Sequence, residues 1–100
     1  MLNIKLVNRG TECELIMVGR LDNNSATGAE KFMNDAGTRF DTLVLNMEHI
    51  EYLSSAGLRT LRRVNSAMRR KDGTLICKNV TEPIMEVFEV TGFAGVLKFA

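Results

Sequence analysis

Two short apolar segments flank one amphipathic segment in the middle of the chain, and this arrangement restricts the fold more than any other feature. Residues 41–47 (DTLVLNM) and 74–80 (TLICKNV) are nearly unbroken apolar runs, as expected of strands buried on both faces. Between them, apolar residues recur at helical spacing, namely Leu58, Leu61, Val64 and Met68. A strand, a helix and a second strand in this order form a right-handed unit with parallel strands. The sequence therefore predicts an α/β fold.

The N-terminal segments extend this sheet. Residues 2–8 and 13–19 predict two strands, and the short turn at Gly10 makes them antiparallel neighbours. A loop over residues 20–26 follows, in which Asn24 or Ser25 caps a helix. The apolar stripe of that helix is expected to consist of Ala29, Phe32, Met33, Ala36 and Phe40.

The C-terminal segments complete the pattern. Thr81 and Pro83 predict the start of a third helix, and Gly92 its end. Its inward side chains are expected to be Ile84, Val87, Phe88 and Thr91. Residues 95–99 predict a short last strand. The expected order is β-β-α-β-α-β-α-β in a single domain of residues 1–100, with a mostly parallel sheet and an antiparallel N-terminal edge strand.

Composition excludes several classes of protein. No run approaches the roughly 18 apolar residues of a membrane span, and residues 1–5 are too mixed for a signal peptide. We therefore expect a cytoplasmic protein with no membrane partner. Cys13 and Cys77 lie in apolar segments and are expected to be reduced and buried. Their spacing and the single histidine, His49, give no support for a metal site.

Two adjacent serines mark the most interesting loop. The predicted loops 20–26, 48–57 and 78–83 follow strands and should cluster at one end of the sheet. Ser54 and Ser55 lie where the second of these loops becomes the central helix. The N-terminus of a helix favours a serine cap and also accommodates a phosphate. Residue chemistry favours a cap over a modified side chain, but Ser54 could cap while Ser55 projects.

Catalysis and nucleic-acid binding are not expected. The sequence lacks a GxSxG nucleophile motif and the glycine-rich nucleotide motifs, and no acid is obviously placed behind His49, so no catalytic residue and no cofactor is predicted. The central helix carries a group of arginines, Arg59, Arg62, Arg63, Arg69 and Arg70. The net charge is only +1 and no aromatic residue alternates with these arginines, so a solvated face or a docking face for an acidic partner is favoured over nucleic acid.

Three segments in this order resemble a known family. They are GRLDNNSA (residues 19–26), LVLNMEHIEYLSSAGLRTL (43–61) and GTLICKNVTEPIMEVFEVTGF (73–93), and the chain resembles a bacterial STAS domain of the anti-sigma factor antagonist type. The resemblance implies a binding module rather than an enzyme. Its partner would be an anti-sigma factor that is also a serine kinase. The kinase would phosphorylate a serine at the start of the helix after the third strand, and a serine phosphatase would remove the phosphate.

The resemblance also implies site residues. The loop of the family typically reads Asp-Ser-Ser/Thr-Gly-Leu. Alignment on Gly57 and Leu58 places Ser55 at the phosphoacceptor position and Ser54, the rival acceptor, at the aspartate position. Asp22 matches the acidic residue of the family's other loop. The implied partner-binding residues are Asp22, Asn23, Asn24, Ser25, Ser54, Ser55, Ala56, Gly57, Arg59, Arg62 and Arg63.

Two other functions stay open on the sequence alone. Some domains of this type act as scaffolds or ligand-sensing modules without a phosphorylation cycle. A small serine hydrolase is a third option, which a reactive phosphonate probe would detect at Ser54 or Ser55.

Overall fold

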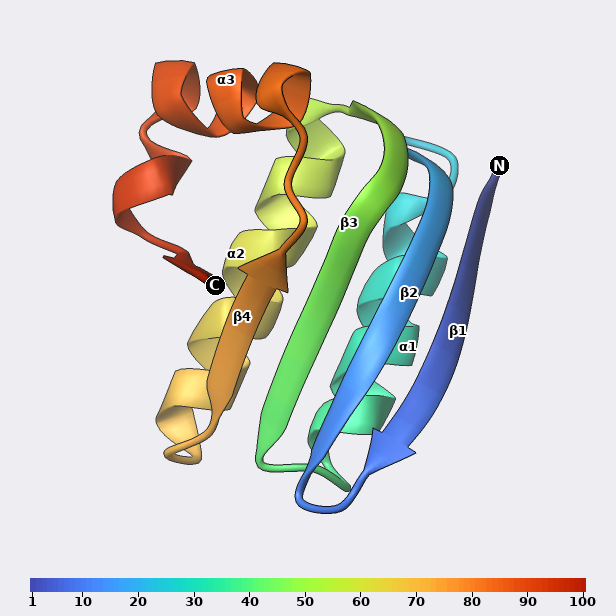
Figure 1. Cartoon of the computed structure of the whole chain (residues 1–100), viewed down its shortest axis with the longest axis vertical. Coiled ribbons are helices and arrows are strands. Elements are labelled where there is room, and N and C mark those ends of the chain that lie inside the picture. The colour runs from blue at the N-terminus through green and yellow to red at the C-terminus, as the bar shows by residue number, and fades with distance from the viewer.

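Five strands form one sheet whose spatial order, β1-β2-β3-β4-β5, is also their order in the chain (Figure 1). The computed structural model describes residues 1–100. The strands are β1 (Leu2–Arg9), β2 (Glu12–Leu21), β3 (Thr42–Leu53), β4 (Thr74–Lys78) and β5 (Lys98–Phe99). The helices are α1 (Ala26–Gly37), α2 (Ser55–Arg70), α3 (Glu82–Thr91) and a short 3₁₀ helix, η1 (Phe93–Gly95). Only the β1–β2 pair is antiparallel, so the predicted fold class is confirmed.

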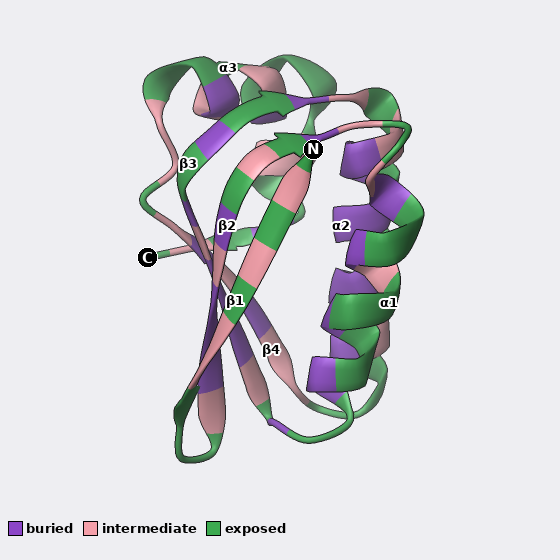
Figure 2. Cartoon of the chain, turned by 90° about the vertical axis from the view of Figure 1, so that its right-hand side faces the viewer, coloured by how far each residue is buried: buried purple, intermediate pink, exposed green.

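The helices cover the sheet unequally. Figures 1 and 2 show α1 and α2 side by side on one face of the sheet, while α3 lies near the carboxyl end of β3. The buried stripes of α1 and α2 face the strands (Figure 2), and they belong to one core of 22 buried residues that also includes Ile84 and Phe88 of α3. The predicted stripe of α2 is fully confirmed, since Leu58, Leu61, Val64 and Met68 are all buried. No helix is long and apolar enough to cross a membrane.

Strand β3 is longer than the sequence suggested. It continues to Leu53, so Glu48, His49 and Glu51 belong to a strand and the prediction of a loop over residues 48–57 was wrong for most of its length. β4 pairs with β3 only as far as Asn46, and β2 is the neighbour of β3 beyond that point. The extension is therefore half-solvated, and its polar side chains resemble a loop in the sequence. The loop over residues 20–26 is shortened in the same way, because β2 continues to Leu21.

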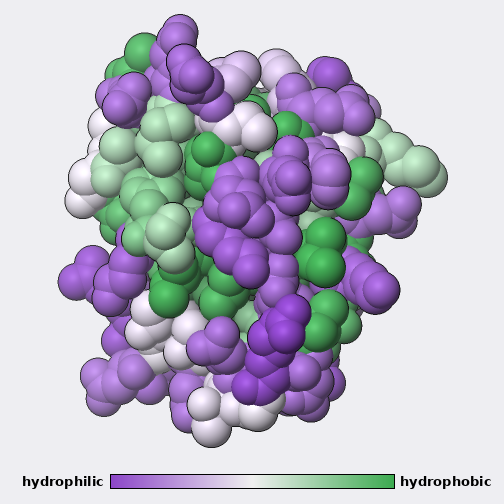
Figure 3. Space-filling view, in the orientation of Figure 1, coloured by the Kyte–Doolittle hydropathy of each residue, from purple (hydrophilic) through white to green (hydrophobic).

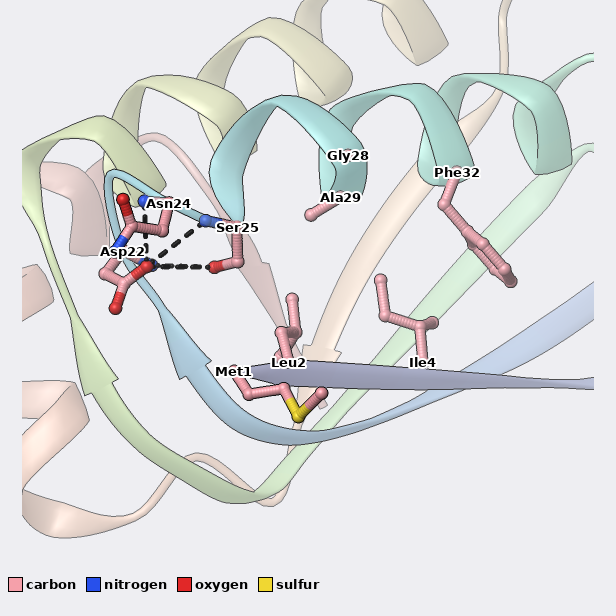
Figure 4. A pocket seen from close by; sticks show the side chains of 9 residues that line it. All are labelled: Met1, Leu2, Ile4, Asp22, Asn24, Ser25, Gly28, Ala29 and Phe32. Carbon is pink, nitrogen blue, oxygen red and sulfur yellow. Dashed lines mark hydrogen bonds between the residues drawn. The ribbon is translucent and has the colours of Figure 1, made fainter.

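Some predicted inward side chains of α1 and α3 are not buried. Phe32 is 37% exposed because it lies over the edge strand β1, where it lines a groove with Leu2 and Ile4 (Figure 4). Thr91 is exposed, and its hydroxyl donates a hydrogen bond to the carbonyl of Val87, which is itself half-buried. Thr81 occupies the predicted cap position, but its side chain makes no capping hydrogen bond.

The two cysteines are buried and unpaired, in agreement with the prediction. Burial raises the pKa of the Cys77 thiol to about 12, and burial also raises the pKa of Cys13. Both thiols are therefore protonated at neutral pH and behave as small apolar side chains. The predicted turn residues are also confirmed, since Gly10 and Gly92 have φ values of 88° and 83°.

The sheet face away from α1 and α2 carries a buried carboxylate. Figure 3 shows that hydrophilic residues gather across the middle of this face. Glu14 of β2 is 4% exposed, and three side chains surround its carboxylate. Arg9 lies 2.9 Å from Oε1, whereas Lys78 and Asn46 lie 3.2 and 2.9 Å from Oε2. The hydrogen bond from Asn46 lowers the pKa of Glu14, and those from Arg9 and Lys78 lower it further, against the opposing effect of burial.

This carboxylate should make folding stability depend on pH. Because its pKa is lower in the folded chain than in the unfolded one, its stabilisation is complete above the ordinary pKa near 4.5 and is lost as the pH falls through the folded pKa. We expect the Glu14→Gln variant to lack this component. Urea unfolding of both proteins between pH 7 and pH 3 measures it. A difference in unfolding free energy that does not shrink toward low pH would contradict this role of Glu14.

Candidate functional site

Two connections meet at the carboxyl end of the sheet. Because β2 and β3 are parallel neighbours with Leu21 opposite Leu53, the residues that follow these strands lie together. The backbone N–H of Ser54 donates to the carbonyl of Leu21 at 3.0 Å. Its hydroxyl lies 3.4 Å from Oδ1 of Asn23. The sheet thus brings the loop Asp22–Ser25 against the start of α2, as expected.

The third predicted loop starts elsewhere. β4 ends opposite Asn46, well before the end of β3. The side chain of Asn79 donates to Oδ1 of Asn46 at 3.2 Å. No hydrogen bond joins residues 78–83 to the two serines.

Asp22 organises the loop before α1. Its Oδ1 accepts hydrogen bonds from the backbone N–H groups of Asn24 and Ser25, at 3.0 and 3.2 Å, and lies 3.3 Å from the Ser25 hydroxyl oxygen (Figure 4). Desolvation raises the pKa of Asp22, but these hydrogen bonds and that of Arg20 together hold it below its usual value. The carboxylate is therefore ionised at neutral pH. Ser25 precedes the helix without capping it, since its oxygen accepts from the backbone N–H of Asp22 at 3.0 Å and its hydroxyl donates to the carbonyl of Arg20 at 2.7 Å.

The two adjacent serines have different environments. Ser54 is the N-cap of α2, and its Oγ accepts a hydrogen bond from the N–H of Gly57 at 3.2 Å. Ser55 is the first residue of the helix and is exposed. No hydrogen bond within the chain engages its hydroxyl. Ser54 is thus held in place by the fold, while the Ser55 hydroxyl is free to meet another molecule.

The predicted partner-binding residues are not equally accessible. Asn23, Asn24, Arg59, Arg62 and Arg63 are exposed. Ala56 is half-buried, whereas Gly57 is buried against the end of β2 and does not offer a surface to a partner. Gly57 therefore positions the serines.

Arginines follow Ser55 along the exposed side of α2. Arg63 lies 3.3 Å from the carboxylate of Glu30 in α1, while Arg59 and Arg62 have no acidic partner. A hollow of about 360 Å³ joins Ser55 and Arg59 to Asn23 and Glu30. This arrangement can hold an anionic group next to Ser55.

No hydrogen bond joins the histidine to either serine. His49 is exposed, and its Nε2 lies 4.0 Å from the carboxylate of its neighbour Glu48. No group of three or more histidine, cysteine, aspartate or glutamate side chains could hold a metal ion.

Sequence reasoning missed two residues beside the site, Tyr52 and Glu30. The Arg20 guanidinium lies 4.4 Å from the ring centre of Tyr52, its register partner, which is 44% exposed. Because residues 48–57 were assigned to a loop, the pairing of these strand residues was not visible. Glu30 was missed as well, since the sequence does not show that α1 packs beside the arginines of α2.

Comparisons with known proteins agree with this fold. A family model described as the STAS domain matches residues 5–100. BtrV of Bordetella bronchiseptica, a protein described provisionally as an anti-sigma factor antagonist, is 35% identical over 66 residues, which are 66% of this chain and 55% of that protein. The chain thus aligns with about half the length of this relative.

Solved structures give the same result. An anti-sigma factor antagonist from Mycobacterium paratuberculosis is 16% identical, with a TM-score of 0.83 and coverage of 99% of this chain and 85% of that one. The Bacillus cell fate determinant SpoIIAA in its phosphorylated form is 18% identical, with a TM-score of 0.74 and coverage of 100% and 91%. At these identities the likeness shows the fold alone.

Proposed function

The chain belongs to the STAS domain family, and from this premise we propose that it is an anti-sigma factor antagonist controlled by phosphorylation of Ser55. In its unphosphorylated form it binds an anti-sigma factor serine kinase and thereby releases a sigma factor. Phosphorylation of Ser55 ends this binding, and a serine phosphatase restores it. Such a function is exerted in the cytoplasm, requires no cofactor and makes the protein a substrate rather than an enzyme.

One observation carries the choice of Ser55. Its hydroxyl is exposed and unbonded at the first position of α2, next to a serine that already caps the helix. Because the cap belongs to Ser54, a phosphate on Ser55 leaves the helix start intact. The relative named as an anti-sigma factor antagonist supports the antagonist function, and SpoIIAA, which shares the fold, has been solved in a phosphorylated form.

The chemistry at Ser55 is a phosphoryl transfer. The Ser55 oxygen attacks the γ-phosphorus of ATP, and a new O–P bond forms as the bond from that phosphorus to ADP breaks. The hydroxyl proton passes to a base of the kinase. When the phosphatase removes the phosphate, water attacks the phosphorus, the bond to the Ser55 oxygen breaks and inorganic phosphate leaves. The serine oxygen regains a proton.

The partner-binding face consists of the exposed parts of the loop Asp22–Ser25 and the exposed side of α2 from Ser55 to Arg63. Its arginines would steer an acidic partner, so association should slow as salt increases. Phosphorylation adds about −1.5 to −2 charges at neutral pH in the middle of this face. Repulsion from an acidic partner and the added bulk both oppose binding.

Mass spectrometry after incubation with the partner kinase and ATP tests the acceptor. We expect one phosphate, on Ser55. The Ser55→Ala variant should carry none. The Ser54→Ala variant should still be phosphorylated on Ser55, although loss of the cap should destabilise it by about 1 kcal/mol. The assignment would be contradicted if a kinase that is active on another substrate left Ser55 unmodified. A phosphate found on Ser54 would contradict it as well.

A second candidate is a STAS scaffold or ligand-sensing module without this cycle. The observation that favours it is Ser54, which stands where the family typically has an aspartate beside the acceptor. However, Ser54 still caps α2, which is a role that aspartate also performs well. The scaffold function predicts partner binding that depends neither on ATP nor on Ser55.

A further inference from the structure

We propose that Arg59 is the internal ligand of the phosphate on Ser55. This inference rests on the proposed function, because it concerns the phosphorylated state of the same site. It adds a second element to the switch, since the phosphate both introduces negative charge and withdraws an arginine from the partner-binding face.

The geometry of α2 places Arg59 next to Ser55. The two residues are four positions apart on one helix, so they lie about 40° apart around its axis and about 6 Å apart along it. Long side chains on a helix lean toward its N-terminus, which directs the Arg59 guanidinium toward Ser55. Both residues line the same hollow of about 360 Å³. An anionic group four residues before a cation is also the favourable orientation of such a pair.

The other nearby charges are less suited to this contact. Arg63 also lines the hollow, but it already pairs with Glu30 at 3.3 Å and lies two turns from Ser55. Arg62 shares the exposed side of α2 but lies about 10 Å along the axis from Ser55. Glu30 is the only carboxylate that lines the hollow, and its pairing with Arg63 reduces its repulsion of a phosphate. Arg59 is thus the unpaired cation within reach.

This contact changes the charge that the partner-binding face presents to the kinase. In the unmodified protein Arg59 is exposed and unpaired, and it is available to an acidic group of the kinase. In the phosphorylated protein its guanidinium binds two oxygens of the phosphate, as arginine commonly does. The partner then loses an attractive charge at the position where it gains a repulsive one.

Phosphorus NMR of the whole chain with phosphoserine incorporated at position 55 tests the inference. The second pKa of free phosphoserine is about 6, and a guanidinium in contact stabilises the dianion. We expect the Arg59→Gln substitution to raise this pKa by about half a unit, because one neighbouring positive charge is lost. The helix N-terminus also lowers the pKa, but it does so equally in both proteins.

The matched control is Arg62→Gln, which removes the same charge from the same helix face two turns away. It should raise the phosphate pKa by much less than Arg59→Gln does. Equal shifts of the phosphate pKa in the two variants would overturn the proposed contact. They would show that the arginines act only through the general electrostatic field of the helix. Since the phosphate is installed without a kinase, this result is independent of whether the kinase recognises Ser55. A failed phosphorylation assay would remove the proposed function without changing the titration.

Discussion

Replacement of Gly57 by alanine should destabilise the protein by about 2 kcal/mol. The added Cβ would lie 2.6 Å from the carbonyl oxygen of Leu21 and 3.0 Å from a methyl carbon of Leu53. The carbonyl already accepts the N–H of Ser54, so it cannot move without disturbing the helix start. The cost of this overlap exceeds the gain of about 1 kcal/mol that alanine brings to a helix. Thermal unfolding should show a midpoint lower by roughly 10 °C.

The control for this substitution is Gly28→Ala in α1. Nothing lies within 4 Å of the Cβ added there, and Gly28 is exposed on the helix. The helix preference of alanine should therefore stabilise this variant by up to about 1 kcal/mol. If Gly57→Ala were as stable as Gly28→Ala, close packing at the start of α2 would not position the serines.

The fold was predictable because the apolar patterns that identify its helices and strands lie within short segments of the sequence. The nearly unbroken apolar run at residues 41–47 and the stripe from Leu58 to Met68 each identify an element that packs in one way. The apolar pattern did not identify the strand where only one face of it is buried. Beyond Asn46, β3 loses β4 as a neighbour, and the resulting mixture of polar and apolar residues does not distinguish a strand from a loop.

The site was predictable in outline but not in its chemistry. The order of parallel strands brings Asp22 near Ser54, and the helix pattern places both serines at its start. The sequence could not show which serine caps, because both residues suit that position. It also could not show that Arg63 pairs with Glu30, since this contact depends on how α1 packs against α2.

A phosphate on Ser55 should weaken binding to the partner kinase by about 100-fold, which corresponds to roughly 2.7 kcal/mol. The dianion would lie at the centre of the proposed binding face, where it opposes an acidic partner and would lose water on binding without gaining a cation from that partner. The fold should persist, because Ser54 retains its hydrogen bond to Gly57. Circular dichroism of the phosphorylated and unmodified proteins should therefore agree.

Two variants separate the effect of a negative charge at position 55 from the effect of losing the hydroxyl. Ser55→Ala should bind the kinase about as well as the unmodified protein, since no hydrogen bond within the chain depends on this side chain. Ser55→Asp should bind more weakly while remaining folded. An unfolded Ser55→Asp protein would instead indicate a structural role for Ser55.

The most direct test is calorimetric titration of the partner kinase with the unmodified chain and with the chain carrying phosphoserine at position 55. The switch predicts tight binding of the unmodified chain and a dissociation constant about 100-fold higher for the phosphorylated one. Equal dissociation constants for the two forms would contradict control by Ser55.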